Sequence, residues 1–423
     1  MQNLIKKNLD KRYKKEALFK KMGIFSISFC ILFLVIFLGT IVFKGHKAFF
    51  VNKIALEVDF REESIRENSN KKENIGNLSF EEIANDLSFV KLVRKSIREK
   101  FSEYKDPQII NSAYKIVSDI ADYRIQKSFE ENPQFINSKQ LIWVEVSSKV
   151  DVYLKYNIST SLKNEEVSII NNLVKKGEIK SFFNYGFFTS SDSREPEIAG
   201  ISASLKGSFY TMIIFLIFAF PIGVASAFYL EEIAKKSKLN DLIEVSINNL
   251  AAIPSIIYGL LGLTVYLQFM NLPRSSSIVA GMTLAMLVLP VIIIATRNTI
   301  RSIPHSIKDA AMALGASKMQ IIIHHLFPLS IPGIMTGTIL AVSRALGETA
   351  PLLMIGMVAF IADSPQNFYE PSTVLPVQIF LWSDSPEIGF AEKTSAAILV
   401  LLTFLIAFNL FAIILRKKFE RKW

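Results

Sequence analysis

Cysteine is almost absent from this chain, and a nucleotide-binding loop is missing altogether. The 423 residues include one cysteine, Cys30, so no disulfide can form within the chain. The pattern G-x-x-x-x-G-K-[ST], whose backbone amides hold nucleotide phosphates in P-loop proteins, does not occur. We therefore expect that any soluble region is held together by its apolar core, and that this chain does not itself hydrolyse ATP.

Charged residues are also scarce over long stretches of the chain. Half of all residues are hydrophobic. Several apolar runs reach the roughly 20 residues that a helix needs to cross a hydrocarbon core about 30 Å thick. These runs span residues 24–43, 208–230, 247–270, 278–296, 329–361 and 395–415. The sequence thus predicts an α-helical polytopic membrane protein with six transmembrane helices.

Basic residues are unevenly divided between the segments that join these runs. With the N-terminus inside, the inner segments are residues 1–22, 231–246, 297–327 and 416–423, and they hold 20 basic and 8 acidic residues. The short outer loops, 271–277 and 362–394, contain only Arg274 and Lys393 as basic residues. Cytoplasmic loops carry an excess of Lys and Arg, so we expect both termini in the cytoplasm. The basic tail, residues 1–23, could also bind acidic lipid or nucleic acid, but topology alone explains it, and we expect no nucleic-acid partner.

A polar segment of domain size, residues 44–200, separates the first two predicted helices. It holds 24 basic and 24 acidic residues, a balance that argues against binding to phosphate backbones. Ser79 and Glu82 form a capping box at the start of a predicted helix, and Asp106 followed by Pro107 predicts the start of another. Alternation of apolar and polar residues over 150–158 predicts a half-buried strand. We expect a mixed α/β extracytoplasmic domain without a catalytic constellation.

Two short helices with a sharp corner between them are predicted after the fourth crossing. Ser302 can cap the first helix, and Gly315 supplies the left-handed residue that ends it. Ser317 and Gln320 form a capping box for the second helix, which is predicted to end before Pro328. The alanines at 310, 311 and 313 leave the first helix thin, so it can enter a groove on another protein.

This corner resembles the "EAA" loop of ABC importer permeases. The resemblance rests on Asp309-Ala310-Ala311, on Gly315, and on Pro328 thirteen residues later. Asp309 replaces the usual glutamate, and His325 and Phe327 stand where the family tends to have Ile and Leu. The resemblance implies that these residues form the loop that couples the permease to separate ATPase subunits, and that this chain is a transport subunit, not an enzyme.

Two further runs are similar to the phosphate-importer permeases of PstA type. They are PGIMTGTILAVSRALGETAPLL, residues 332–353, and FFTSSDSREPEIAGISASLKGS, residues 187–208. The resemblance implies a five-helix permease core over residues 201–415, followed by a cytoplasmic tail, 416–423, in a bacterial inner membrane. It also implies four partners without any cofactor: a second permease of PstC type, two ATPase subunits, and an extracytoplasmic protein that delivers phosphate. Residues 44–200 then correspond to an N-terminal extension of unknown role.

Arg344 and Glu348 are charged residues within a membrane-length run, where such residues commonly mark a pathway or a pairing site. Their spacing of four places them on one helix face, close enough to pair. Our hypothesis is that they pair in a closed gate and that phosphate competes for the planar donor fork of Arg344. The alternative is a static salt bridge that never contacts substrate.

Two other sets of residues have competing interpretations. Arg297, at the end of the fourth crossing, could form an inner anion station, or it could be an interfacial arginine that obeys the topology rule. His324 and His325 are adjacent and so point about 100° apart on a helix, which argues against a metal site. We expect no bound metal.

Two alternative functions remain open at this point. The chain could carry another oxyanion, such as sulfate or molybdate. It could also be a membrane receptor that senses a ligand through residues 44–200, but that alternative leaves the later crossings and the Asp309 loop without a role.

Overall fold

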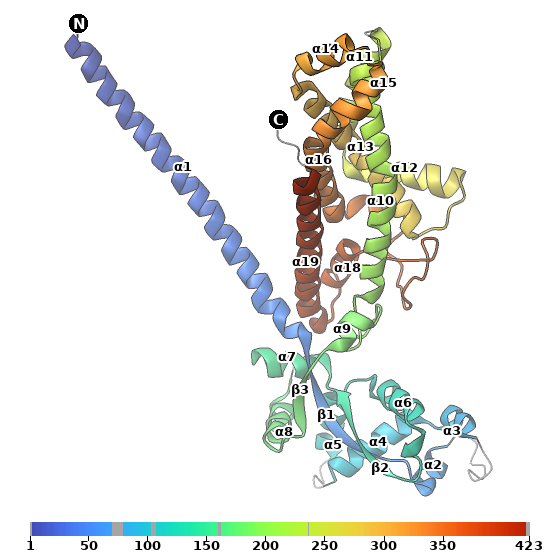
Figure 1. Ribbon diagram of the computed structural model, residues 1–423. Coiled ribbons are helices and arrows are strands. Elements are labelled where there is room, and N and C mark those ends of the chain that lie inside the picture. Colours follow the sequence, from blue (N-terminus) through green and yellow to red (C-terminus); the bar gives the residue numbers. More distant parts are fainter. Residues whose placement is uncertain (1, 70–78, 103–106, 160–161, 236, 420–423) are drawn as a thin grey trace.

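The computed structural model describes residues 2–69, 79–102, 107–159, 162–235 and 237–419 (Figure 1). A domain with a small sheet lies at one end of a helical bundle, and the helical corner at α14 and α15 lies at the other end (Figure 1). Helix α1 leaves the junction between domain and bundle and diverges from the other helices (Figure 1).

Among the described residues, five helical stretches are long and apolar enough to cross a membrane, or six if one bent pair counts as a span. The upper number agrees with the six predicted crossings. The helices in these stretches are α1 (Gln2–Gly45), α10 (Ser202–Phe228) with the π-helical η4 (Tyr229–Ile233), α13 (Ser277–Ser302), α16 (Phe327–Gly347) and α19 (Ile388–Phe419).

The bent pair corrects the prediction of one straight helix over residues 247–270. Helix α11 (Lys238–Ala251) is followed by α12 (Ser255–Gly262) and the π-helical η5 (Leu263–Phe269), and the chain bends by 104° between them. The cause is Pro254, which lacks a backbone N–H and disfavours helical geometry at the residue before it.

The prediction of one long helix over residues 329–361 was also wrong at both ends. The helix begins earlier, at α15 (Lys318–Ile321), and continues through the π-helical η6 (Ile322–Leu326) into α16. Pro328 therefore lies inside a helix, directly after the wide π turn, where the regular backbone bonding is already interrupted. At its other end, α16 stops at Gly347, and a separate short helix, α17 (Ala350–Met354), begins with Pro351 in its first turn.

The domain contains a three-stranded antiparallel sheet with the order β2-β1-β3. The strands are β1 (Phe50–Asp59), β2 (Lys139–Glu145) and β3 (Ile179–Phe183). Among the described residues, seven α-helices belong to the same domain: α2 (Glu62–Asn68), α3 (Phe80–Asp86), α4 (Phe89–Lys100), α5 (Pro107–Ile116), α6 (Ala121–Glu131), α7 (Ser148–Tyr156) and α8 (Asn164–Lys175). Its buried side chains form one cluster that includes Ile54, Leu56 and Phe129, and this cluster is separate from the core of the helical bundle.

Within this domain, the capping box at Ser79 is confirmed, because the backbone N–H of Ser79 donates to Glu82 Oε2 at 2.7 Å. The strand predicted over 150–158 is wrong, because residues 148–156 form helix α7. Val150 and Tyr153, three residues apart, face the core together, and Asn157 ends the helix in the left-handed conformation. Helix α5 begins at Pro107 as predicted, but Asp106 lies outside the described residues.

Buried ion pairs connect the domain to the N-terminal part of α19. Lys155 Nζ lies 2.6 Å from Asp151 Oδ2 on its own helix and 2.6 Å from Glu392 Oε1 on α19. Nearby, the backbone N–H of Ser148 donates to Glu197 Oε1 at 2.6 Å. The junction is therefore a packed interface and not a loose linker.

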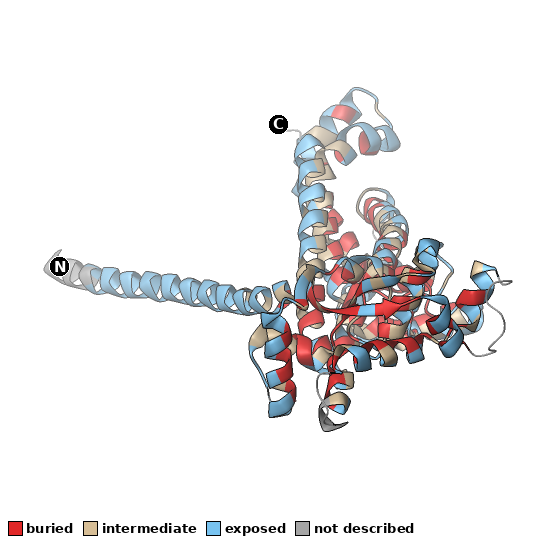
Figure 2. Cartoon of the chain, turned by 90° about the horizontal axis from the view of Figure 1, so that it is seen from below, coloured by how far each residue is buried: buried red, intermediate tan, exposed pale blue. Residues whose placement is uncertain are grey.

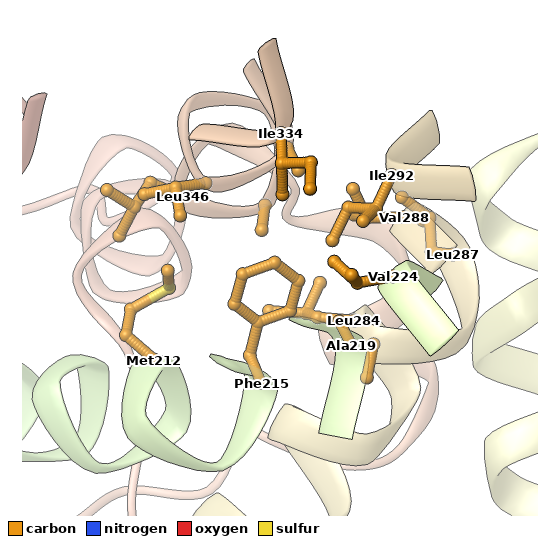
Figure 3. Close-up of a cluster of buried hydrophobic side chains, with 14 of the residues drawn as sticks. Met212, Phe215, Ala219, Val224, Leu284, Leu287, Val288, Ile292, Ile334 and Leu346 are labelled. Carbon is orange, nitrogen blue, oxygen red and sulfur yellow. The ribbon is translucent and has the colours of Figure 1, made fainter. Parts of the chain in front are cut away.

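The bundle core lies where α10, α13 and α16 meet. Phe215 of α10 sits at the centre of a cluster whose other members include Leu284 and Ile334 (Figure 3). Figure 2 shows that buried residues gather in the sheet domain and where helices pack together, whereas α1 is exposed along nearly its whole length. The remaining short helices are η1 (His46–Phe49), η3 (Pro133–Phe135), α9 (Tyr185–Thr189), α14 (His305–Ala313) and α18 (Leu375–Ser383).

Candidate functional site

The first part of the site is the corner between α14 and α15. Helix α14 begins after Pro304, not after Ser302, which is the last residue of α13. Gly315 has φ +85°, the left-handed conformation predicted for it. The backbone N–H of Ser317 donates to Gln320 Oε1 at 2.8 Å, which confirms the second capping box. The predicted helix, corner and helix are therefore present.

The corner has an anchored inner side and an exposed outer side. Ala311 is buried and belongs to the bundle core, and Ala316 packs against that core. Asp309 and Ala310 are exposed. Leu314, at the tip of the corner, is 90% exposed, and Met319 is also exposed. An exposed group of apolar side chains on a structured corner is the type of surface that binds another protein.

An ionic cluster supports the base of this corner. Arg297 Nη2 lies 2.8 Å from Glu244 Oε2, and Arg297 Nε lies 3.2 Å from Glu231 Oε2. Arg301, one turn further along α13, pairs with the same two carboxylates at 2.9 Å and 3.6 Å. The four side chains form part of the wall of a cavity of about 480 Å³. Both donor edges of the Arg297 guanidinium are therefore already occupied by carboxylates.

The acidic half of this cluster was missed by sequence reasoning. Glu231 and Glu232 lie on η4 and Glu244 lies on α11, so their partners are more than fifty residues away along the chain. Glu232 pairs with Lys308 of α14, which ties the corner to the end of α10. The only signal in the sequence was the spacing of Arg297 and Arg301, four residues apart on one helix.

The second part of the site is the pair formed by Arg344 and Glu348. Arg344 Nε lies 3.3 Å from Glu348 Oε1, as their spacing of four residues predicts. Because α16 ends at Gly347, Arg344 lies in the last helical turn and not in the middle of a crossing, and Glu348 is the first residue beyond the helix. A cation at this end of a helix interacts favourably with the helix dipole. The two side chains are 39% and 19% exposed.

The surroundings of this pair are packed on one side and open on the other. Ser343 Oγ donates to Asn409 Oδ1 of α19 at 3.1 Å. Gly259 of α12 approaches Pro351 so closely that an added Cβ would lie 2.7 Å from the Pro351 Cα. Along α16, however, Thr336, Leu340 and Arg344 are exposed at intervals of four residues. Arg344 thus projects from a face of α16 that the described residues leave largely exposed.

The described residues contain no group of three or more His, Cys, Asp or Glu side chains arranged to hold a metal ion. His324 and His325 lie on η6 and are both exposed.

This chain is similar to two protein families and to several known transport proteins. The family model described as "Binding-protein-dependent transport system inner membrane component" matches residues 219–423. A second model, "Domain of unknown function (DUF3333)", matches residues 6–164. The "Probable ABC transporter permease protein YqgI" of Bacillus subtilis is 33% identical over 246 residues, which cover 55% of this chain and 83% of that protein. The chain belongs to this family of ABC importer permeases.

Other relatives of the permease carry a more specific name. The "Phosphate transport system permease protein PstA" of Haemophilus influenzae is 32% identical over 53% of the permease and 78% of its own length. The protein of the same name from Yersinia pestis is 30% identical over 52% of the permease and 73% of its own length. Among solved structures, a chain of the MetNI methionine ABC transporter aligns with 52% of the permease and 95% of its own length, with 18% identity and a TM-score of 0.41.

Proposed function

We propose that this permease moves inorganic phosphate into the cytoplasm, driven by ATP hydrolysis on separate subunits. Relatives of about 30% identity are named as phosphate transport permeases, and their similarity extends over half of the chain. Sequence identity of about 30% establishes the fold, and the substrate needs support from the structure as well. The observation in the structure that carries the proposal is therefore the position of Arg344.

Arg344 has the chemistry and the exposure that a phosphate pathway needs. Its guanidinium is a planar fork of donors that matches the oxygens of a phosphate group. Its one ionic partner among the described residues is Glu348, and the Arg344 side chain is 39% exposed. Arg297, by contrast, is held between two carboxylates and is 8% exposed, which favours a structural role for it over that of an anion station. An anion approaching Arg344 competes with one carboxylate instead of two.

The exposed face of α16 also favours a second permease as partner. A charged group at membrane depth faces a bundle interior or a water-filled cavity and not lipid. The described residues of this chain leave 39% of the Arg344 side chain exposed. We infer that a homologous subunit, of PstC type, packs opposite α16 and closes a pathway between the two subunits.

The corner at Gly315 is proposed to receive one of two ATPase subunits. Asp309, Ala310, Ala311, Gly315 and Pro328 supply its pattern, and the exposed Leu314 and Met319 add apolar contact area. The pair of Lys308 with Glu232 ties this corner to the end of α10, and the ionic cluster at Arg297 ties that end to α13. A displacement of α14 by an ATPase subunit is therefore transmitted to the helices of the bundle. It reaches α16 directly through η6.

The orientation that fits these roles places both termini and the corner in the cytoplasm. Residues 44–200 then lie outside, where a binding protein delivers phosphate. The boundaries proposed from the sequence are kept: a tail at 1–23, a first span at 24–43, the outer domain at 44–200, the core at 201–415 and a tail at 416–423, of which 420–423 lie outside the described residues.

Transport of sulfate or molybdate is the second candidate, because a guanidinium fork also accepts those oxyanions. The receptor alternative is less favoured, because the transport family matches residues 219–423. Labelled-anion uptake into cells that lack this chain, and into cells with the chain restored, separates these candidates. We expect phosphate uptake to be lost in cells that lack the chain and to return in cells with the chain restored. Excess sulfate or molybdate should not compete with this phosphate uptake. Loss of sulfate or molybdate uptake instead would overturn the phosphate assignment.

A further inference from the structure

Aromatic rings form a continuous ladder at the junction of the sheet domain and the bundle. Adjacent ring centroids along it are 4.8 to 6.4 Å apart. From the bundle outward, the ladder consists of Phe390, Trp382, Phe187, Phe49, Phe188, Phe183 and Tyr185, and Phe50 also packs against Phe183 at 5.9 Å. Residues 183–188 fall between the two matched families, which end at 164 and begin at 219.

The two ends of the ladder differ in exposure. The inner rings, Phe187, Trp382 and Phe390, are buried in a cluster with residues of α19. At the outer end, Tyr185 is 73% exposed, and Phe50, Phe183 and Phe188 are between 38% and 47% exposed. Four large rings thus form one apolar surface, which we name the aromatic collar.

The aromatic collar lies at the level where the membrane spans end. Gly45, the last residue of α1, touches α19 so closely that an added Cβ would lie 2.9 Å from the Ser395 backbone. The 3₁₀ turn η1 leads from there to the collar, and its four residues advance about 8 Å at a rise of 2.0 Å per residue. The headgroup layer on each side of a bilayer is about 5–8 Å thick. The collar therefore begins about one headgroup-layer thickness from the end of α1.

The surface next to the collar is an exposed apolar helix of membrane-spanning length. Helix α1 is exposed along its apolar run, up to Val42 and Phe43 just before Gly45. Interfaces between membrane and water are enriched in aromatic side chains whose ring is apolar and whose tip is polar. Tyr185, the most exposed ring of the collar, is of that kind.

We propose that the aromatic collar rests in the headgroup region of the outer leaflet and seats the sheet domain on the membrane surface. The sheet domain is then held both by the buried pairs of Lys155 and by the bilayer itself. This proposal depends on the membrane spans and not on which anion the permease carries.

The lone cysteine of the chain makes a direct test possible. A nitroxide label on Cys30, which is exposed on the apolar run of α1, reports a position in the lipid core. In a Cys30→Ser background, Tyr185→Cys places the label on the collar. Tyr123→Cys, on α6, is the matched control, because Tyr123 is 54% exposed on the same domain but outside the collar. The complete importer is reconstituted in vesicles of phosphatidylethanolamine and phosphatidylglycerol, and label accessibility to oxygen and to nickel ethylenediaminediacetate is measured.

We expect the ratio of oxygen to nickel accessibility at residue 185 to be severalfold higher than at residue 123 and lower than at residue 30. A ratio equal to that at residue 123 would show that the collar faces water. Low accessibility to both reagents would show that another protein covers it. Either result overturns the proposal. Phe183→Cys repeats the measurement at a second collar position, so a local effect of one substitution cannot decide the outcome.

Discussion

Arg344 and Glu348 form an ion pair in which both side chains keep part of their surface exposed. In the water-filled pathway proposed for Arg344 this is a solvent-exposed pair, and such pairs typically contribute about 0.2–1 kcal/mol to stability, because two long side chains must be held in one geometry. Opening this pair for a passing anion therefore costs little. The low cost is what the competition hypothesis requires, since Arg344 must exchange partners in every transport cycle.

Glu348→Gln tests this exchange at the level of one residue. Removal of the competing carboxylate leaves Arg344 free, so phosphate is expected to bind more tightly and to leave more slowly. We expect both the KM and the kcat of phosphate uptake to fall severalfold. Glu370→Gln, in the loop between α17 and α18, is the control and should change neither constant. Unchanged kinetics in the Glu348 variant would indicate a static salt bridge.

Glu145 in the sheet domain is a buried carboxylate with two basic partners. Its side chain is 2% exposed, Lys53 Nζ lies 3.1 Å from Oε1, and Arg124 Nε lies 3.0 Å from Oε2. Burial by itself raises the pKa of Glu145, but the hydrogen bond and charge of Arg124, with the charge of Lys53, outweigh burial and lower this pKa. Its contribution to stability is then complete above the ordinary glutamate pKa of 4.5 and is lost as the pH falls through the lowered value.

Glu145→Gln is expected to lower the free energy of unfolding of the sheet domain by about 3 kcal/mol at neutral pH, because it leaves two cations without their carboxylate. Hydrogen exchange of the β1 and β2 amides in the full chain measures this loss. The difference between wild type and variant should shrink below pH 4.5. Glu57→Gln, on β1 with a 63% exposed side chain, is the control and should cost about 0–1 kcal/mol.

At the level of elements, the points where a helix bends or ends inside an apolar run were harder to predict than the presence of the helices. The capping boxes at Ser79 and Ser317 and the left-handed Gly315 could be predicted, because each is a local signal of a few residues. The bend at Pro254 was missed, because a count of apolar residues runs straight across it. Residues 150–158 were misassigned because nine residues of alternating polarity do not separate a strand from a short helix with one buried face.

Gly315 gives a prediction at this scale. A Cβ at Gly315 would have no atom within 4 Å, so only the backbone conformation resists substitution. A β-branched residue in the left-handed region costs about 1–2 kcal/mol, whereas Asn tolerates it. We expect Gly315→Val to weaken co-purification of the ATPase subunits about 5- to 30-fold, and Gly315→Asn to stay near wild type. Co-purification at the wild-type level in both variants would exclude this corner as the contact between the permease and its ATPase subunits.

For the molecule as a whole, composition and apolar runs were enough to predict a polytopic membrane protein with a polar insertion of domain size, and the permease assignment came from the resemblance of its motifs. They could not predict which strands form the sheet, because β1 and β3 pair across more than 120 residues. Nor could they predict the contact of Lys155 with Glu392, 237 residues apart, because a single basic residue on a short helix gives no signal of a distant partner.

The separate cores predict that the bundle folds without the sheet domain. Asn52 and Ser181 are antiparallel partners, so a two-residue Asn-Gly turn can replace residues 53–180. This deletion removes Lys155, and Glu392→Gln should accompany it so that the carboxylate of Glu392 is not left buried without that cation. We expect the shortened chain to assemble with its partners and to retain phosphate uptake. If the shortened chain assembled normally but did not take up phosphate, the sheet domain would have a direct role in transport.

The most direct test of the whole account is ATP-driven accumulation of labelled phosphate in vesicles that contain the purified importer, with Arg344→Gln compared with wild type. Arg66→Gln, which also removes an arginine paired with one glutamate four residues away but lies in the sheet domain, is the matched control. We expect the Arg344 variant to lose at least about tenfold in rate, equivalent to about 1.4 kcal/mol, while its partner subunits still co-purify. A wild-type rate in a fully assembled Arg344→Gln importer would contradict the account.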